Sequence, residues 1–126
     1  MASILKVDEM QGVTSAGDIT ITGEGTATMQ LQQGLAKVWV FGTDNVITDS
    51  LNTSSSTDVG TGEYTFTFTS ATATTNVAMS ACVNENQNLI VGRKSNTTSS
   101  YNIRIKNTSN TGTDANTGSS VHGDLA

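Results

Sequence analysis

Hydrophobic and polar residues alternate over several short stretches of the chain, and the clearest of these is residues 58–69. There Tyr64, Phe66 and Phe68 alternate with threonines. Side chains of a β-strand point to opposite faces with a period of two, so the three aromatic side chains share one face. This face is the densest apolar patch of the sequence, and we expect it to be buried in the core of a β-domain.

The same period predicts further strands along the chain. Residues 35–41 are apolar on both faces, with Val38 and Val40 on one and Trp39 and Phe41 on the other. Such a strand is typically central in its sheet and covered from both sides. The other strands predicted after it are residues 46–51, 77–83, 89–92, 101–106 and 120–125. Polar stretches separate the strands, and we expect loops at residues 52–62, 84–88, 96–100 and 108–119.

This spacing of short strands indicates an antiparallel β-sandwich, jelly-roll-like in form, over residues 35–126. Residues 1–34 form a separate N-terminal arm, because the alternation breaks at Gln32-Gln33-Gly34. Within the arm, residues 19–22 and 26–31 flank Gly23-Glu24-Gly25 and predict a β-hairpin. A lone hairpin is only marginally stable in water, so we expect the arm to pack on a partner.

The composition supports the all-β class and adds an expectation of self-association. Only 35% of the 126 residues are hydrophobic and 13% are charged, while threonine, serine, asparagine and glycine are abundant and proline is absent. Threonine favours strands, and the other three residue types favour turns. So few large apolar side chains build a thin core. Sharing a core between subunits relieves that shortage, and we expect a homo-oligomer.

The charge and the cysteine count exclude several classes of protein. A net charge of −5 argues against binding to nucleic-acid phosphates. The single cysteine, Cys82, cannot form an intrachain disulfide. The first ten residues include acidic side chains where a signal peptide would have its apolar region, and no apolar run reaches membrane-spanning length. We therefore expect a protein that folds in a cytoplasm and does not insert into a membrane.

We find no set of residues that predicts catalysis, a metal or a cofactor. His122 is the only histidine, and we expect it at a strand edge or an interface; Cys82 is expected to be a small buried hydrophobe. The nearest cation candidates, residues 44–49 and 114–116, match no calcium-loop spacing. The sequence therefore predicts neither an enzyme nor a metalloprotein.

Two groups of residues are candidates for contacts with partners. Arg93, Lys94, Arg104 and Lys106 hold most of the positive charge of an acidic chain. They form either a solvated face or a contact with an anionic surface glycan or an acidic neighbouring subunit. The candidate interface residues are Leu5, Val7, Trp39 and Phe41. A lone Trp in an apolar strand more often lies in a core or a subunit interface than under a sugar.

Four segments together resemble a family of tail-fibre and related virion appendage proteins of tailed bacteriophages, especially phages of aquatic bacteria. They are LKVDEMQG at residues 5–12, QGLAKVWVFG at residues 33–42, TDVGTGEYTFTFT at residues 57–69 and HGDLA at residues 122–126. The order of the motifs is that of the family, and together they span most of the chain. These motifs are structural and carry no catalytic chemistry.

The resemblance implies a non-enzymatic virion structural protein that self-assembles, as a trimer, in the host cytoplasm. The arm would attach to other virion proteins or wind with its symmetry mates, and the sandwich would contact the host surface, including its glycans, through many weak contacts. Because the chain lacks a long repetitive shaft, a capsid decoration protein on the same fold is the alternative. A glycan-cleaving tailspike is disfavoured, since no pair of carboxylates accompanies aromatic residues.

Overall fold

The computed structural model describes residues 7–10, 19–22, 28–84 and 88–124. The chain divides into two compact units, Met1–Leu35 and Ala36–Ala126. Each unit is described by itself below.

No helix among the described residues is long and apolar enough to cross a membrane.

The first unit contains a small antiparallel hairpin. Strand β1 (Thr20–Thr22) pairs with β2 (Thr28–Gln30), and the Leu31 N–H continues the ladder by donating to the Ile19 carbonyl at 2.8 Å. The predicted pairing of these strands is therefore confirmed, while the predicted loop between them lies outside the described residues. One helical turn, α1 (Leu31–Gly34), follows where the alternation breaks. A single turn is too short to leave a periodic signal in the sequence.

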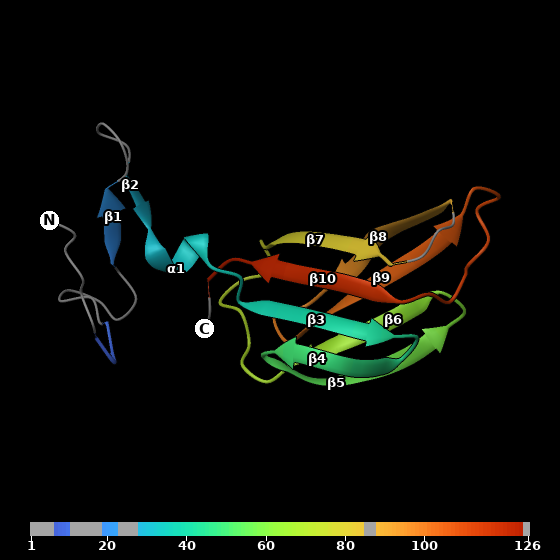
Figure 1. Cartoon of the computed structure of the whole chain (residues 1–126), viewed down its shortest axis with the longest axis horizontal. Coiled ribbons are helices and arrows are strands. Elements are labelled where there is room, and N and C mark those ends of the chain that lie inside the picture. The colour runs from blue at the N-terminus through green and yellow to red at the C-terminus, as the bar shows by residue number, and fades with distance from the viewer. Residues whose placement is uncertain (1–6, 11–18, 23–27, 85–87, 125–126) are drawn as a thin grey trace, which may run out of the picture. The chain divides into compact units, whose positions relative to one another are not determined.

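The second unit consists of two four-stranded antiparallel sheets that enclose one core (Figure 1). The β3 sheet has the strand order β4-β3-β10-β7, and the β6 sheet has the order β5-β6-β9-β8. The strands of the β3 sheet are β3 (Val38–Thr43), β4 (Val46–Leu51), β7 (Ala78–Val83) and β10 (Thr117–His122). Those of the β6 sheet are β5 (Thr53–Gly60), β6 (Glu63–Phe68), β8 (Leu89–Asn96) and β9 (Ser100–Asn107). The all-β class is confirmed, and the two sheets are consistent with the predicted sandwich.

The expected loop at residues 52–62 is wrong, because most of it is strand β5. This strand pairs with β6 from Thr53 opposite Phe68 to Gly60 opposite Glu63. Its polar sequence shows no hydrophobic alternation, so the strand is specified by its backbone ladder and not by an apolar face. Asn52 alone makes the corner between the sheets: it has φ 56°, a conformation that asparagine tolerates. Its side-chain oxygen accepts the Ser70 N–H at 2.6 Å.

Other boundaries shift by a few residues. Strand β10 begins at Thr117, so the loop expected at residues 108–119 is shorter than predicted. Strand β8 continues to Asn96, four residues beyond its predicted end, because residues 93–96 are polar but still pair with β9. Strand β4 has the bounds predicted from its alternation.

The core lies between the inner faces of the two sheets. Tyr64, Phe66 and Phe68 of β6 are buried, as predicted from their period. They pack with the buried residues of the neighbouring strands, which are Val38, Val40, Tyr101, Ile103, Ile105, Ala115 and Val121. Trp39 and Phe41 point to the opposite face of β3, which is the central strand that its two-sided apolar pattern predicts.

Tyr101 joins the two sheets at the centre of this core. Its ring lies 5.2 Å from that of Phe66 and 5.7 Å from that of Phe68, at tilted angles that favour aromatic contact. Its hydroxyl forms a 2.6 Å hydrogen bond with Ser119 Oγ on β10 of the opposite sheet. Burial raises the pKa of Tyr101 to about 12, and the bond to Ser119 partly opposes this rise.

Replacing Tyr101 by Phe should change how stability depends on pH. Because the folded pKa is raised, the stabilisation is fully present below about pH 10 and is lost as the pH rises towards 12. Near pH 8 the variant should be less stable by about 1 kcal/mol, since it lacks the hydrogen bond. Above pH 10 the wild type should lose up to about 2–3 kcal/mol that the variant keeps.

Urea denaturation of both proteins between pH 8 and 11.5 measures this crossover. Tyr64 is present in both proteins, so its own titration cancels from the comparison. A difference in unfolding free energy that stays constant over this pH range would contradict the account of Tyr101.

Candidate functional site

The outer face of the β6 sheet carries a row of basic side chains. Burial of Ile103 and Ile105 on the inner side of β9 turns Arg104 and Lys106 outward. The register places Arg104 between Glu63 of β6 and Gly92 of β8. The sequence pattern predicted the outward direction of these two residues, while the pairing of the strands decides what lies beside them.

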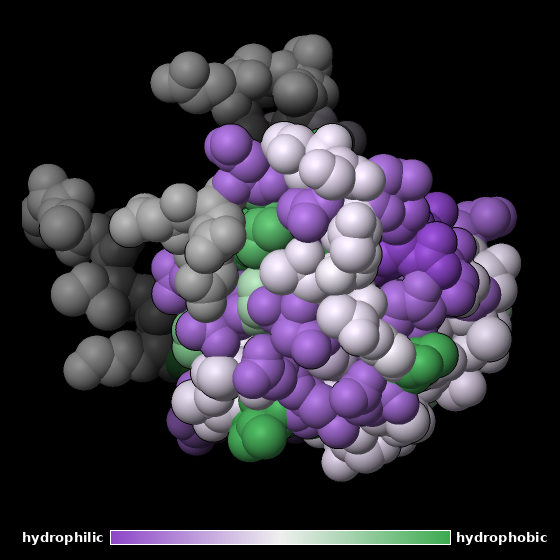
Figure 2. Space-filling model, turned by 90° about the vertical axis from the view of Figure 1, so that its right-hand side faces the viewer, coloured by the Kyte–Doolittle hydropathy of each residue, from purple (hydrophilic) through white to green (hydrophobic). Residues whose placement is uncertain are grey.

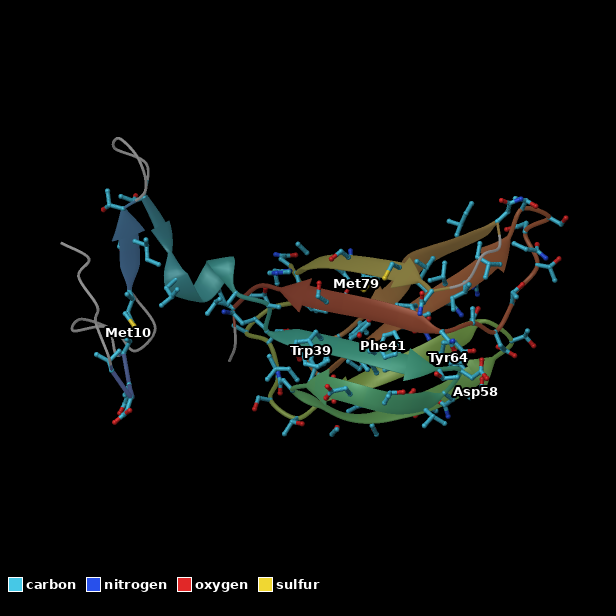
Figure 3. The ribbon with its side chains drawn as sticks, viewed as in Figure 1. Met10, Trp39, Phe41, Asp58, Tyr64 and Met79 are labelled. Carbon is cyan, nitrogen blue, oxygen red and sulfur yellow. The ribbon has the colours of Figure 1, made fainter. Side chains whose placement is uncertain are left out.

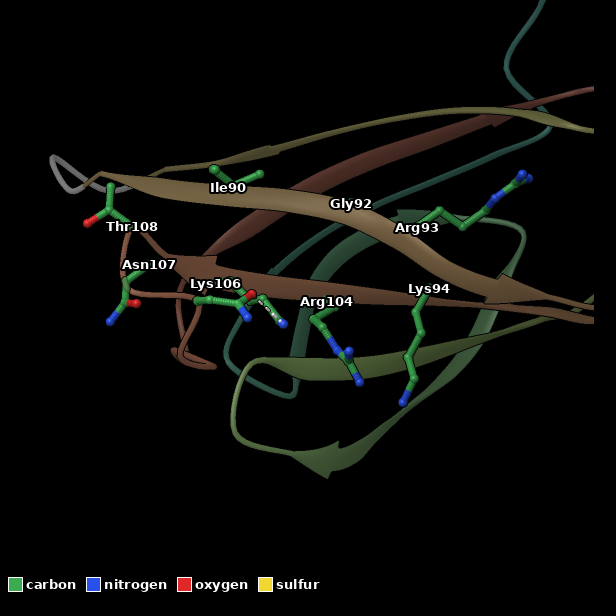
Figure 4. Close-up of a pocket in the computed structure, with 9 residues that line it drawn as sticks. Ile90, Gly92, Arg93, Lys94, Arg104, Lys106, Asn107 and Thr108 are labelled. Atoms are coloured by element: carbon green, nitrogen blue, oxygen red, sulfur yellow. Dashed lines mark hydrogen bonds between the residues drawn. The ribbon is translucent and has the colours of Figure 1, made fainter.

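These residues line a groove of about 500 Å³, which we call the basic groove. Its walls combine positive charge with amide, hydroxyl and apolar groups, from Ile90, Gly92, Arg93, Lys94, Arg104, Lys106, Asn107, Thr108 and Asn110. Figure 4 shows Lys94, Arg104 and Lys106 extending to the same side of the sheet. Ile90 is 66% exposed and provides an apolar wall. The volume lies in the range of pockets that bind small ligands or short segments.

Glu63 lies among the basic side chains and forms ion pairs with two of them. Lys94 Nζ donates to Glu63 Oε2 at 2.7 Å, and the Arg104 guanidinium donates to Glu63 Oε1. The hydrogen bond from Lys94, together with Arg104, lowers the pKa of Glu63, while desolvation of the carboxyl partly opposes this effect. The side chains of Lys94 and Arg104 remain 42% and 38% exposed, so both can also face a ligand.

Arg93 also lines the groove, but its side chain does not extend with those of the other three basic residues. Its register partner is the buried Ile103, and a β-bulge separates it from Lys94. Figure 4 shows its side chain extending away from Lys94 and Arg104. Its Nη1 donates to the Val77 carbonyl at 3.2 Å, at the edge of the β3 sheet. All four predicted surface-contact residues therefore line the groove, and the charged ends of three of them lie on the same side of the sheet.

A tight turn after β9 forms one end of the basic groove. Lys106 Nζ donates to Asn110 Oδ1 at 2.7 Å. The Asn107 side-chain oxygen accepts the N–H groups of Ser109 and Thr111, each at 3.0 Å. Asn110 has φ 63°, which asparagine accepts more readily than most residues. The turn is thus shaped by asparagines, for which the sequence predicts no more than a place in or beside a loop.

Asp114 fastens the segment after this turn to the β5–β6 turn. Its Oδ1 accepts the Gly62 N–H at 2.6 Å and the Tyr64 hydroxyl at 2.9 Å. Burial of Tyr64, followed by its bond to the Asp114 carboxylate, raises the pKa of Tyr64. Figure 3 shows Tyr64 and Asp58 together at this end of the sandwich. One end of the aromatic stripe therefore holds the loop that closes the groove.

The close approach of the two segments requires glycine. Gly62 has φ 72°, and a Cβ there would lie 2.5 Å from the Ile105 carbonyl oxygen. A Cβ at Gly112 would collide with the carbonyl oxygen of Thr61. Gly62 of the G-T-G segment is therefore needed for backbone packing in addition to its role in the turn, whereas a Cβ at Gly60 would meet nothing within 4 Å.

The candidate interface residues are not brought into this groove. Val7 is exposed in the first unit, and Leu5 lies outside the described residues. Trp39 and Phe41 lie on the outer face of the β3 sheet (Figure 3), beside a hollow of about 480 Å³. Small side chains line the rest of this hollow, including Ser80, Cys82, Gly118 and Ser120.

Two single-residue expectations can be compared with the structure. The expected burial of Cys82 is wrong, because it lies on the outward face of β7, where alternate residues are exposed. His122 is the last residue of β10, an inner strand, and pairs with Ala78 of β7, so it does not lie on a sheet edge; its interface role stays a prediction. Among the described residues, no group of three His, Cys, Asp or Glu side chains could hold a metal ion. Asp114, which belongs to one of the two candidate cation segments, accepts hydrogen bonds from Gly62 and Tyr64.

Comparison with models of protein families, with curated proteins and with solved structures finds no match for this chain.

Replacing Asp114 by Ala should loosen the loop that closes the basic groove. The change removes two hydrogen bonds to a carboxylate, and we expect it to lower the unfolding free energy by about 1–2 kcal/mol. Asp124→Ala removes the same charge from an exposed residue after β10 and serves as the matched control. Chemical denaturation measures both variants. An equal effect of the two substitutions would contradict the role of Asp114.

Proposed function

We propose that this chain is a non-enzymatic structural protein of a bacteriophage virion, of the tail-fibre or appendage type. In this proposal it self-assembles as a trimer. Its sandwich has a jelly-roll-like topology and forms the outer part of the assembly, which makes the contacts. The N-terminal arm attaches the protein to other virion proteins or to its symmetry mates. Many copies together adhere to a host surface, so each contact need only be weak.

The resemblance of four segments to the appendage family supports the virion assignment. The structure adds a specific observation in favour of assembly, which is the apolar outer face of the β3 sheet. Phe41, Val46 and Leu51 are 38%, 68% and 47% exposed on this sheet, and the half-buried Trp39 lies two residues before Phe41 on β3. The exposed Asp49 lies opposite Phe41. Trp39 pairs with Leu51 across the two strands, so the apolar side chains are neighbours.

A second copy of the chain is the partner that fits this face best. The protein has a thin core, and apolar residues that a larger protein would bury remain exposed in both of its units. Contiguous exposed apolar side chains mark interaction sites. By contrast, the end of the sandwich with the β5–β6 turn shows mostly hydrophilic and neutral residues (Figure 2). That end suits exposure to solvent or to a host surface.

Light scattering coupled to size-exclusion chromatography tests the assembly. We expect the wild-type protein to have three times the mass of one chain. Phe41→Asp should shift it towards the monomer, because a carboxylate would have to be buried in an apolar contact. Val59→Asp introduces the same charge at an exposed apolar residue of β5 and should leave the trimer intact. A well-folded wild-type monomer would exclude the proposed assembly.

Immuno-gold labelling of phage particles tests the location. Label at the tail supports the appendage assignment. Label over the head instead favours the alternative, a capsid decoration protein on the same fold. Particles without label would contradict both assignments.

A further inference from the structure

We propose that the basic groove binds the acidic segment at residues 7–10 of a neighbouring copy of this chain. This inference rests on the proposed self-assembly and names the two surfaces that would meet. It gives the arm a defined docking place on the sandwich of another subunit.

The charges of the two surfaces are complementary in number. The side chains of Lys94, Arg104 and Lys106 carry three positive charges and Glu63 carries one negative charge, so this side of the groove keeps two positive charges. Arg93 also lines the groove, but its side chain extends away from these three. Residues 7–10 read Val-Asp-Glu-Met, and Asp8-Glu9 is the only pair of adjacent acidic residues in the sequence. This pair would bring two negative charges. In a chain with a net charge of −5, a basic surface attracts the acidic parts of other copies.

The apolar parts of the two surfaces are also complementary. Val7 and Met10 are 51% and 54% exposed on either side of the acidic pair. Ile90 is 66% exposed on the wall of the basic groove, so it offers these side chains an apolar contact. Each surface therefore combines opposite charge with exposed apolar area, which favours a specific contact over a diffuse electrostatic one.

The backbone leaves room for a segment in the groove. Gly92 lies beside Arg104, and a Cβ at Gly92 would meet nothing within 4 Å. A larger side chain at this position would therefore fill the groove without disturbing the sheet. The turn held by Asn107 and Asp114 keeps the end of the groove in place before binding. A preformed site lowers the entropic cost of ordering the segment.

Disulfide trapping between two single-cysteine proteins tests the contact. Both proteins carry Cys82→Ser; one also carries Met10→Cys and the other Ile90→Cys. They are mixed and oxidised with copper phenanthroline at low ionic strength. We expect a crosslinked dimer that contains one copy of each. The control pairs Met10→Cys with Val59→Cys, because Val59 is 53% exposed on β5, at the opposite edge of the β6 sheet from β8. Equal crosslinking in the two mixtures would overturn the proposal.

Charge substitutions test whether the electrostatic match drives the contact. Adding Asp8→Asn and Glu9→Gln to the Met10→Cys protein should slow crosslinking about tenfold. Added salt should slow crosslinking of the proteins that keep Asp8 and Glu9. Gly92→Phe should block it by filling the groove. Lys106→Gln should weaken it more than Arg93→Gln, which removes the same charge from a side chain that extends away from the other three and donates to the Val77 carbonyl. Equal effects of Lys106→Gln and Arg93→Gln would overturn the local contact.

The outcomes separate this inference from the proposed function. If the wild type is an oligomer but the Met10→Cys and Ile90→Cys proteins do not crosslink, the inference is overturned and the proposed assembly stands. A wild-type monomer overturns the assembly itself. A protein that carries Met10→Cys and Ile90→Cys together and forms only an intrachain disulfide shows that the arm fills the groove of its own chain, which also overturns the exchange between copies.

Discussion

Burial of Tyr64, Phe66 and Phe68 on one face of β6 is the constraint on which the rest of the sandwich depends. The aromatic stripe supplies three large side chains to the core, and it packs against Tyr101 of β9 on its own sheet. A shift of one residue in this strand would turn all three rings to the solvent, so the register with β9 is strongly specified. That register places Glu63 opposite Arg104 on the outer face. The core and the basic groove are thus two sides of the same strand pairing.

Tyr64 extends this constraint from the sheet to the loop that closes the groove. Its ring is buried with the other aromatic side chains, while its hydroxyl donates to Asp114. The same carboxylate accepts the Gly62 N–H, and the Ile105 N–H donates to the Gly62 carbonyl at 2.7 Å. The loop buries only one small apolar side chain in the core, Ala115, and the hydrogen bonds of Asp114 hold it to the end of the aromatic stripe. The end of the groove is therefore fixed by the core.

Much of the sandwich is predictable because its inward faces alternate. The inward directions of Tyr64, Phe66, Phe68, Tyr101, Ile103 and Ile105 all follow from their period. Strand β5 was missed since Ser and Thr on both faces leave no such pattern. The basic groove was predictable only in part. Its cations are visible in the sequence, but the place of Glu63 between them depends on strand pairing, a tertiary effect that local periodicity does not record. The opposite directions of Arg93 and Lys94, by contrast, follow from the alternation of adjacent residues along β8.

Amide hydrogen exchange measured by NMR tests the central claim most directly, that the aromatic core of β6 also fixes the loop at the groove. The account predicts that the Gly62 and Ile105 amides exchange about as slowly as the Phe66 amide, because all three would open only when the core opens. It also predicts that Tyr64→Phe speeds exchange at Gly62 more than at Phe66. Fast exchange at Gly62 in the wild-type protein, at the rate of an unstructured loop, would contradict it.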